Sequence, residues 1–168
     1  MLCRGCLLIA LSLVLAQAAP SGPAKPAAVA AAAAHLDHAM SVLLSATSAD
    51  DDVRTGLASL LDAVTDAVPP STTIGVACGA NMAVARWEFA HGSMFDQSAT
   101  ALVEGCYREM YQDARFQVPA DVRTPQDARA FIGKQLSLAR QLLLQDQPTD
   151  AVRPLIETIV FIMTPIQA

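Results

Sequence analysis

Cysteine and histidine are the side chains of this sequence with the clearest capacity for chemistry, and both are scarce. The chain has four cysteines and three histidines in 168 residues. Cys3 and Cys6 lie in an N-terminal segment that resembles a secretory signal, so its removal would leave Cys78 and Cys106 as one pair. In an exported chain such a pair predicts a disulfide, with two buried free cysteines as the alternative. A nucleophilic Cys106 is disfavoured, because no histidine lies nearby in sequence.

The histidines do not complete a metal or catalytic motif. His35 and His38 are three residues apart, a spacing that lets two imidazoles on one helix face share a metal ion. His91 is remote from both, and we expect it to cap the C-terminal end of a helix. The nucleophile-elbow, zinc-protease and phosphate-loop motifs are absent from the sequence. We therefore predict no catalytic residues, no metal and no cofactor, and we expect a non-enzyme, with a metal-assisted hydrolase as a minor alternative.

Four aromatic and basic side chains could serve in binding. Trp87 follows Cys78 by nine residues, which at about 100° per residue points it away from the cysteine. Arg86 adjoins Trp87, and Tyr107 and Tyr111 lie near Cys106 but off its helix face. Because Trp, Tyr and Arg dominate interface hot spots, these four are candidate partner-binding residues. The competing expectation, favoured by the usual burial of large aromatic side chains, is that Trp87 packs under neighbouring helices.

Helix start and stop signals predict an antiparallel helical hairpin around the cysteines. The first helix should begin at Ser71, directly after two prolines, and should stop at His91, which precedes a glycine. The second should begin at Ser93, where Ser93 and Asp96 form a capping pattern. Helices separated by so short a turn are antiparallel neighbours. A short strand over residues 72–78, which are rich in β-branched side chains, is the alternative.

The apolar positions of the two predicted helices have matching spacing, which sets the register of the hairpin. In an antiparallel pair, residues at equal height have numbers with a constant sum, and that sum is 184 for all five apolar pairs. Cys78 and Cys106 satisfy it and should therefore face each other at a distance that a disulfide can bridge. The apolar positions are Ile74, Cys78, Met82, Ala85 and Phe89 in the first helix and Phe95, Ala99, Leu102, Cys106 and Met110 in the second.

Four further helical segments complete the prediction. One helix carries Leu36 to Leu44, and the next runs from the acidic group at Asp50 to Val68. A third begins at the Thr124-Pro125 cap and ends before Pro148. The last opens at Thr149-Asp150 and is apolar nearly all round, so it should be central to the core. We expect Pro154 in its first turn or at its true start, and a buried strand is the alternative for this segment.

These elements predict a small all-α helical bundle of five to six helices with a disulfide-linked antiparallel helical hairpin. We assign residues 1–18 to a signal peptide, residues 19–34 to an Ala/Pro-rich tether and residues 35–168 to a single helical domain. After signal removal we expect no membrane span. The net charge of −5 and the absence of a basic cluster make nucleic acid a poor partner.

The leading functional hypothesis is a secreted or periplasmic protein that binds a protein partner, as an inhibitor, immunity factor or envelope chaperone does. It rests on export, compact helices and missing catalytic motifs. The alternative is a carrier that holds an apolar small molecule in the bundle core, suggested by the apolar last helix and by Met40, Met82, Met110 and Met163. We expect the protein in the periplasm, with the extracellular space as the alternative.

Overall fold

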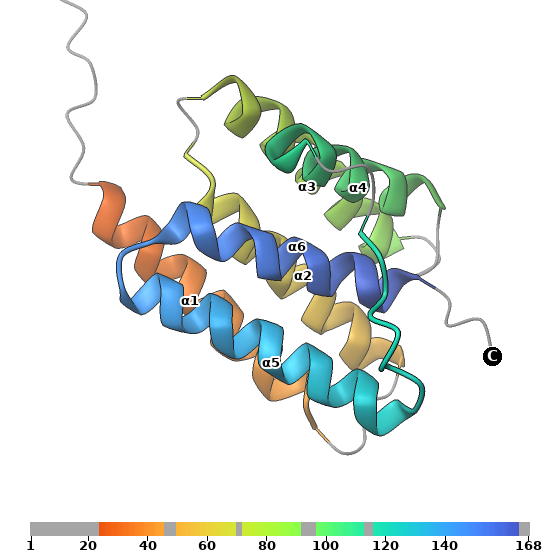
Figure 1. Ribbon diagram of the computed structural model, residues 1–168. Helices are drawn as coiled ribbons and strands as arrows, with labels where there is room; N and C mark the ends of the chain where they lie inside the picture. The colour runs from red at the N-terminus through yellow and green to blue at the C-terminus, as the bar shows by residue number, and fades with distance from the viewer. Residues whose placement is uncertain (1–23, 46–49, 70–71, 92–96, 113–115, 165–168) are drawn as a thin grey trace, which may run out of the picture.

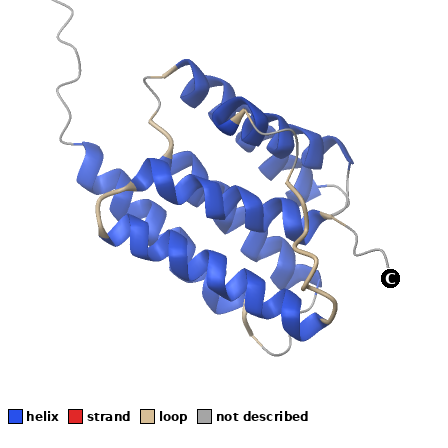
Figure 2. Ribbon diagram, in the orientation of Figure 1, coloured by secondary structure: helices blue, strands red, loops and turns tan. Residues whose placement is uncertain are grey.

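The computed structural model describes residues 24–45, 50–69, 72–91, 97–112 and 116–164, and all regular structure in these ranges is helical (Figures 1 and 2). The predicted all-α helical bundle is therefore confirmed, and the two strand alternatives are wrong. The signal peptide and the capping pattern at Ser93 lie outside the described residues. The six helices are α1 (Ala24–Leu43), α2 (Asp50–Ala67), α3 (Thr73–His91), α4 (Gln97–Tyr111), α5 (Pro125–Leu144) and α6 (Pro148–Met163).

The helices pack as three consecutive pairs around a centre formed by α2 and α6 (Figure 1). α2 contacts α1, α3 and α6, while α6 contacts α5, α2 and α4. The α3–α4 pair therefore lies on one side of the centre, and α1 and α5 lie on the other. This arrangement leaves α3 with helical neighbours on its inner side alone, because α2 and α4 are the helices that it packs against.

α6 is the most buried helix, as its sequence predicted. Apolar side chains from Ala151 to Met163 are buried around most of its circumference. The expectation for Pro154 was wrong, since α6 begins at Pro148 and Pro154 is its seventh residue. A proline inside a helix removes the hydrogen bond to the carbonyl four residues earlier. Here that carbonyl belongs to Asp150 in the exposed first turn, where water can replace the missing donor.

α1 begins at Ala24, so residues 24–34, which we expected to belong to a tether, form the first half of a helix. Alanine offers little area for burial, but it allows a neighbouring helix to approach closely. Ala32 is fully buried, and Val29 and Ala33 pack against the core. On the facing helix, a Cβ added to Gly56 would overlap the Leu43 side chain, which shows how close α1 and α2 lie.

The start of α5 has the predicted cap at Thr124, and Asp127 completes a capping box. Thr124 Oγ1 accepts from the Asp127 backbone N–H at 3.1 Å, and Asp127 Oδ2 accepts from the Thr124 N–H at 2.9 Å. We expect Thr124→Ala to lower the free energy of unfolding by about 1 kcal/mol, measured by urea denaturation. The neighbouring Gln126→Ala, which leaves the box intact, is the control. An equal loss in both variants would contradict the role of the cap.

The same capping box should make stability depend on pH in the acid range. The hydrogen bond from Thr124 and those from the Arg123 and Thr124 N–H groups lower the pKa of Asp127 below its usual value of 3.8. The stability that these bonds add is present above pH 3.8 and is lost as the pH falls through the lower pKa of the folded state. Asp127→Asn should therefore reduce the loss of stability between about pH 4 and pH 2, measured by thermal unfolding against pH. An unchanged pH profile would contradict this assignment.

Candidate interaction surface

The disulfide fixes α3 against α4 in the register that the sequence predicted. Cys78 and Cys106 are joined with an S–S distance of 2.02 Å and a Cα–Cα distance of 5.2 Å. Both are buried, as are Met82, Ala85 and Phe89 on the same face of α3. Because both sulfurs are committed to this bond, neither is available as a nucleophile. The side chain of Ile74 and residue Phe95 lie outside the described residues.

The N-terminal cap of α3 differs by one residue from the prediction. Thr72 caps the helix: Thr72 Oγ1 accepts from the Gly75 N–H at 2.8 Å, and α3 begins at Thr73. Ser71 is not among the described residues. A Cβ added at Gly75 would overlap the Pro69 carbonyl oxygen, which belongs to the backbone of the turn between α2 and α3. Only glycine fits here without moving that turn.

We expect Gly75→Ala to destabilise the protein by about 2 kcal/mol, because the new methyl group must displace backbone. Gly105→Ala is the matched control. A Cβ at Gly105 in α4 has no neighbour within 4 Å, so the usual preference of a helix for alanine should raise stability by up to about 1 kcal/mol. Urea denaturation of both variants measures the contrast. Two changes of the same sign would contradict the close approach at Gly75.

The outer side of α3 carries a continuous row of exposed, uncharged side chains. Their positions are spaced by alternating steps of three and four residues, as in one face of a coiled coil. At 100° per residue the row lies opposite Cys78 and the core. Val76 is 66% exposed and Trp87 is 63% exposed. We call this row the α3 seam, and it consists of Thr73, Val76, Ala80, Ala83, Trp87 and Ala90.

The expectation that Trp87 is buried was wrong. No described helix packs on the outer side of α3, so the ring is exposed, and it stacks on His91 with 4.7 Å between ring centroids and 22° between planes. His91 Nδ1 lies 2.9 Å from the Trp87 carbonyl oxygen, where it donates a hydrogen bond and caps the end of α3 as predicted. The hydrogen bond fixes the His91 ring at the end of α3, and the stacking restrains the indole against it.

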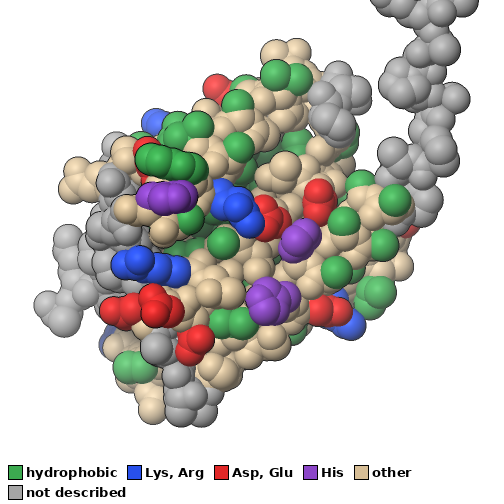
Figure 3. All heavy atoms as spheres, turned by 180° about the vertical axis from the view of Figure 1, so that it is seen from behind, with side chains coloured by type: hydrophobic (Ala, Val, Ile, Leu, Met, Phe, Trp, Pro, Cys, Tyr) green, Lys and Arg blue, Asp and Glu red, His purple; other side chains and the backbone are tan. Residues whose placement is uncertain are grey.

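The two charged side chains of α3 are held at the edges of the α3 seam. Arg86 Nε is 2.7 Å from Asp62 Oδ1 of α2. On the other edge, Glu88 Oε2 accepts from Ser98 Oγ of α4 at 2.9 Å. α3 contains no other lysine, arginine, aspartate or glutamate. Seen from behind, several hydrophobic side chains lie on the upper part of the molecule, and most of the acidic, basic and histidine side chains visible from this side lie lower (Figure 3).

Tyr107 and Tyr111 do not join Arg86 and Trp87, so the four candidate residues form two separate groups. Tyr107 is buried and Tyr111 is half-buried, and both face α6. The Arg153 guanidinium lies 5.1 Å from the Tyr111 ring centroid and 5.9 Å from that of Tyr107. The Tyr107 hydroxyl donates to Glu157 Oε1 at 3.0 Å.

This tyrosine group has the properties of a structural joint between α4 and α6. Burial raises the pKa of Tyr107, and its hydrogen bond to Glu157 raises it further. Burial also raises the pKa of Tyr111, whose hydroxyl is buried without a hydrogen-bond partner among the described residues. Both phenols therefore stay neutral at physiological pH and are enclosed. Arg86 and Trp87 remain as the exposed members of the predicted set.

Of the two histidines of α1, His35 lies in an ordinary surface contact and His38 is exposed. His35 Nε2 is 3.6 Å from Asp66 Oδ2, and Asp37 pairs with Arg140 of α5. Burial raises the pKa of Asp66, while His35 lowers it. Within the part of the chain that the structure describes, no three histidine, cysteine or carboxylate side chains gather as metal ligands would.

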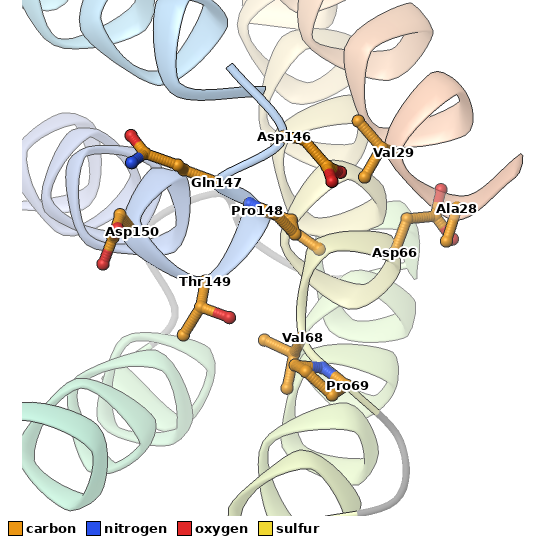
Figure 4. A pocket seen from close by; sticks show the side chains of 11 residues that line it. Ala28, Val29, Asp66, Val68, Pro69, Asp146, Gln147, Pro148, Thr149 and Asp150 are labelled. Atoms are coloured by element: carbon orange, nitrogen blue, oxygen red, sulfur yellow. The ribbon is translucent and has the colours of Figure 1, made fainter. Parts of the chain in front are cut away.

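A cavity of about 500 Å³ opens where α1, the end of α2 and the turn between α5 and α6 meet (Figure 4). Its walls are mostly apolar, with three carboxylates among them, and sequence reasoning missed it because its parts are remote along the chain. None of the four methionines that suggested a carrier lines it; Met82 and Met163 are buried in the core. The lining includes Val29, Val68, Pro69 and Pro148 with Asp66, Asp146 and Asp150.

Comparison with known proteins adds no functional information. No family model matches the chain, and no curated protein or solved structure is significantly similar to it. Within the described residues, none of the helices combines the length and the apolar character needed to cross a membrane. Function therefore has to be inferred from the residues of this chain.

Proposed function

We propose that this protein is a non-enzymatic, extracytoplasmic binding protein that recognises a protein partner through the α3 seam. The observation that carries the proposal is the exposed row of side chains that includes Val76 and Trp87. Large apolar side chains exposed in a line on one helix are typical of interaction sites, whereas scattered ones are ordinary surface. Three of the six exposed large apolar side chains among the described residues lie on α3, namely Val76, Val84 and Trp87.

Trp87 is the expected energetic centre of the interface. Tryptophan is the residue type most enriched at interface hot spots, where it fills a pocket of the partner. Its stacking on His91 restricts the ring before binding, which reduces the entropy lost when the complex forms. The uncharged seam also avoids the desolvation of charged groups, because Arg86 and Glu88 are bonded at its edges.

The cellular location belongs to the same proposal. A buried disulfide in a small domain is typical of oxidising compartments, and the sequence of residues 1–18 has the character of a secretory signal. We propose the periplasm, with the extracellular space as the alternative.

Site-specific photo-crosslinking tests the binding proposal. The full chain, with a C-terminal tag, carries a benzophenone amino acid either at Val84, beside the α3 seam, or at Leu138 of α5. Leu138 is the matched control for Val84, because the two side chains are similarly exposed: Val84 is 48% exposed and Leu138 is 44% exposed. We expect a protein adduct in native cells from position 84 and not from position 138. Adding Trp87→Ala should reduce the yield by at least about 10-fold. Equal yields at both positions, or none at 84, would contradict the proposal.

The cavity of Figure 4 supports a second candidate function, binding of a small apolar ligand with a cationic group. Apolar walls would enclose the body of such a ligand, and Asp66, Asp146 and Asp150 would attract its charge. Dodecyltrimethylammonium is a suitable probe, and dodecyl sulfate is its matched anionic control. We expect the cation alone to raise the melting temperature below its micellar concentration and Val68→Trp, which fills the cavity, to abolish the shift. Equal effects of both probes would contradict this candidate.

A further inference from the structure

We propose that the partner bound by the α3 seam is a second copy of this chain, in an antiparallel arrangement about a twofold axis. This inference rests on the proposed function, because it names the occupant of the same surface. We infer it from the order of side chains along the seam, from the lack of charge in the seam, and from the restrained position of Trp87.

The seam is complementary to itself when one copy runs antiparallel to the other. Pairs of positions whose numbers add to 163 then face each other, and every member of the seam has such a mate. Trp87 of one copy lies on Val76 of the other, and Thr73 lies opposite Ala90. At the centre, Ala80 faces Ala83, and side chains this small let the two helices approach closely. The large Trp87 side chain near each end of the contact thus meets the smaller Val76, and the twofold axis repeats this pair at both ends.

The charges permit this pairing although the whole chain carries a net charge of −5. No charged residue belongs to the seam, so none is desolvated. The nearest cation, Arg86, would lie level with Ala77 of the other copy. The two Arg86 positions would be about 14 Å apart along the helix axis, farther than a Debye length of about 8 Å at physiological salt. Like-charge repulsion across the axis is therefore weak.

The size of the contact sets the expected strength. A single pair of helices of the length of α3, 19 residues, buries less than a standard interface of about 1,600 Å². A reversible dimer with a dissociation constant in the micromolar range is expected. Sedimentation of the purified full chain between about 1 µM and about 500 µM should show monomer passing to dimer. Trp87→Ala should weaken the dimer at least about 30-fold, while Leu138→Ala should leave it unchanged.

Cysteine cross-linking tests the register. Chains carrying Thr73→Cys are mixed with chains carrying Ala90→Cys and oxidised with copper phenanthroline, which leaves the buried native disulfide closed. The mixture should give a covalent dimer of one chain of each kind. Neither variant alone should cross-link, because two copies of the same position would lie about 25 Å apart along the axis. Cross-linking of Thr73→Cys with itself would overturn the antiparallel register.

The outcomes separate this inference from the proposed function. A chain that stays monomeric at every concentration overturns the second-copy inference. If position 84 then photo-crosslinks to a different protein in cells, the proposed function stands alone. If position 84 gives no adduct and the chain stays monomeric, both fall. An adduct of twice the chain mass at position 84, together with the Thr73–Ala90 cross-link, supports both.

Discussion

Replacing both Cys78 and Cys106 with alanine is expected to lower the free energy of unfolding by about 3.5 kcal/mol, the largest loss of any change considered for this chain. The two cysteines are 28 residues apart, and opening a loop of that size restores conformational entropy to the unfolded chain. The double variant also loses two buried sulfur atoms from the α3–α4 contact. Such a loss is a large share of the stability of a small domain.

Urea denaturation followed by far-ultraviolet circular dichroism measures this loss. The double replacement is preferable to a single one, because a lone cysteine could form intermolecular disulfides. Met82→Leu, a volume-conserving change in the same face of α3, is the control and should cost less than about 1.5 kcal/mol. Intact mass before and after reduction and alkylation verifies the disulfide in the parent chain. A loss below about 1 kcal/mol in the double variant would contradict the role assigned to the disulfide.

The hairpin was predictable from sequence because its information is local. Two helices joined by a short turn must be antiparallel, and apolar positions at helical spacing then fix which residues are level. Cys78 and Cys106 followed from that register without any knowledge of the other helices. The cap at Thr124 was equally local, since Asp127 lies three residues away. Both features depend on residues that are close in sequence, so the packing of the other helices does not change them.

The errors concern features that depend on remote parts of the chain. Trp87 was expected to be buried, but no described helix covers the outer side of α3. Residues 24–34 were expected to form a tether, because alanines alone do not reveal that this segment packs against remote helices, as the buried Ala32 and the neighbouring Val29 do. Pro154 was expected in the first turn of α6, but it lies further inside the helix. A proline is tolerated there because the carbonyl that it leaves without a donor belongs to the exposed Asp150, and that exposure depends on how α6 packs into the core.

The candidate site was only partly predictable for the same reason. The sequence indicated Arg86, Trp87, Tyr107 and Tyr111 by residue type. It did not indicate that the first two are exposed on α3 while the two tyrosines face α6. The division follows from the docking of α6 on α4, in which Glu157 and Tyr107, 50 positions apart, form a hydrogen bond. The exposure of the α3 seam likewise follows from which helices pack on α3.

Glu157→Ala is expected to lower the free energy of unfolding by about 3 kcal/mol, because this carboxylate joins three helices. It is 15% exposed. It accepts from the Tyr107 hydroxyl of α4 at 3.0 Å, from Gln135 Nε2 of α5 at 2.8 Å and from Arg153 Nε of α6 at 2.9 Å. Its removal leaves the Tyr107 hydroxyl and the Gln135 amide without their acceptor in a largely enclosed site. Arg153 is half-exposed and can turn to water.

A second ion pair in the same bundle supplies the matched control. Arg140 Nε lies 2.6 Å from Asp37 Oδ1, a shorter distance than that between Arg153 and Glu157, yet both partners are about half-exposed. Solvent screens such a pair, so Asp37→Ala should change stability little. Glu157→Gln, which keeps an acceptor for Tyr107, should fall between the two alanine variants. If Asp37→Ala and Glu157→Ala lowered the urea midpoint equally, enclosure would not be what gives the Glu157 contacts their strength, and the joint between α4, α5 and α6 would be merely a surface feature.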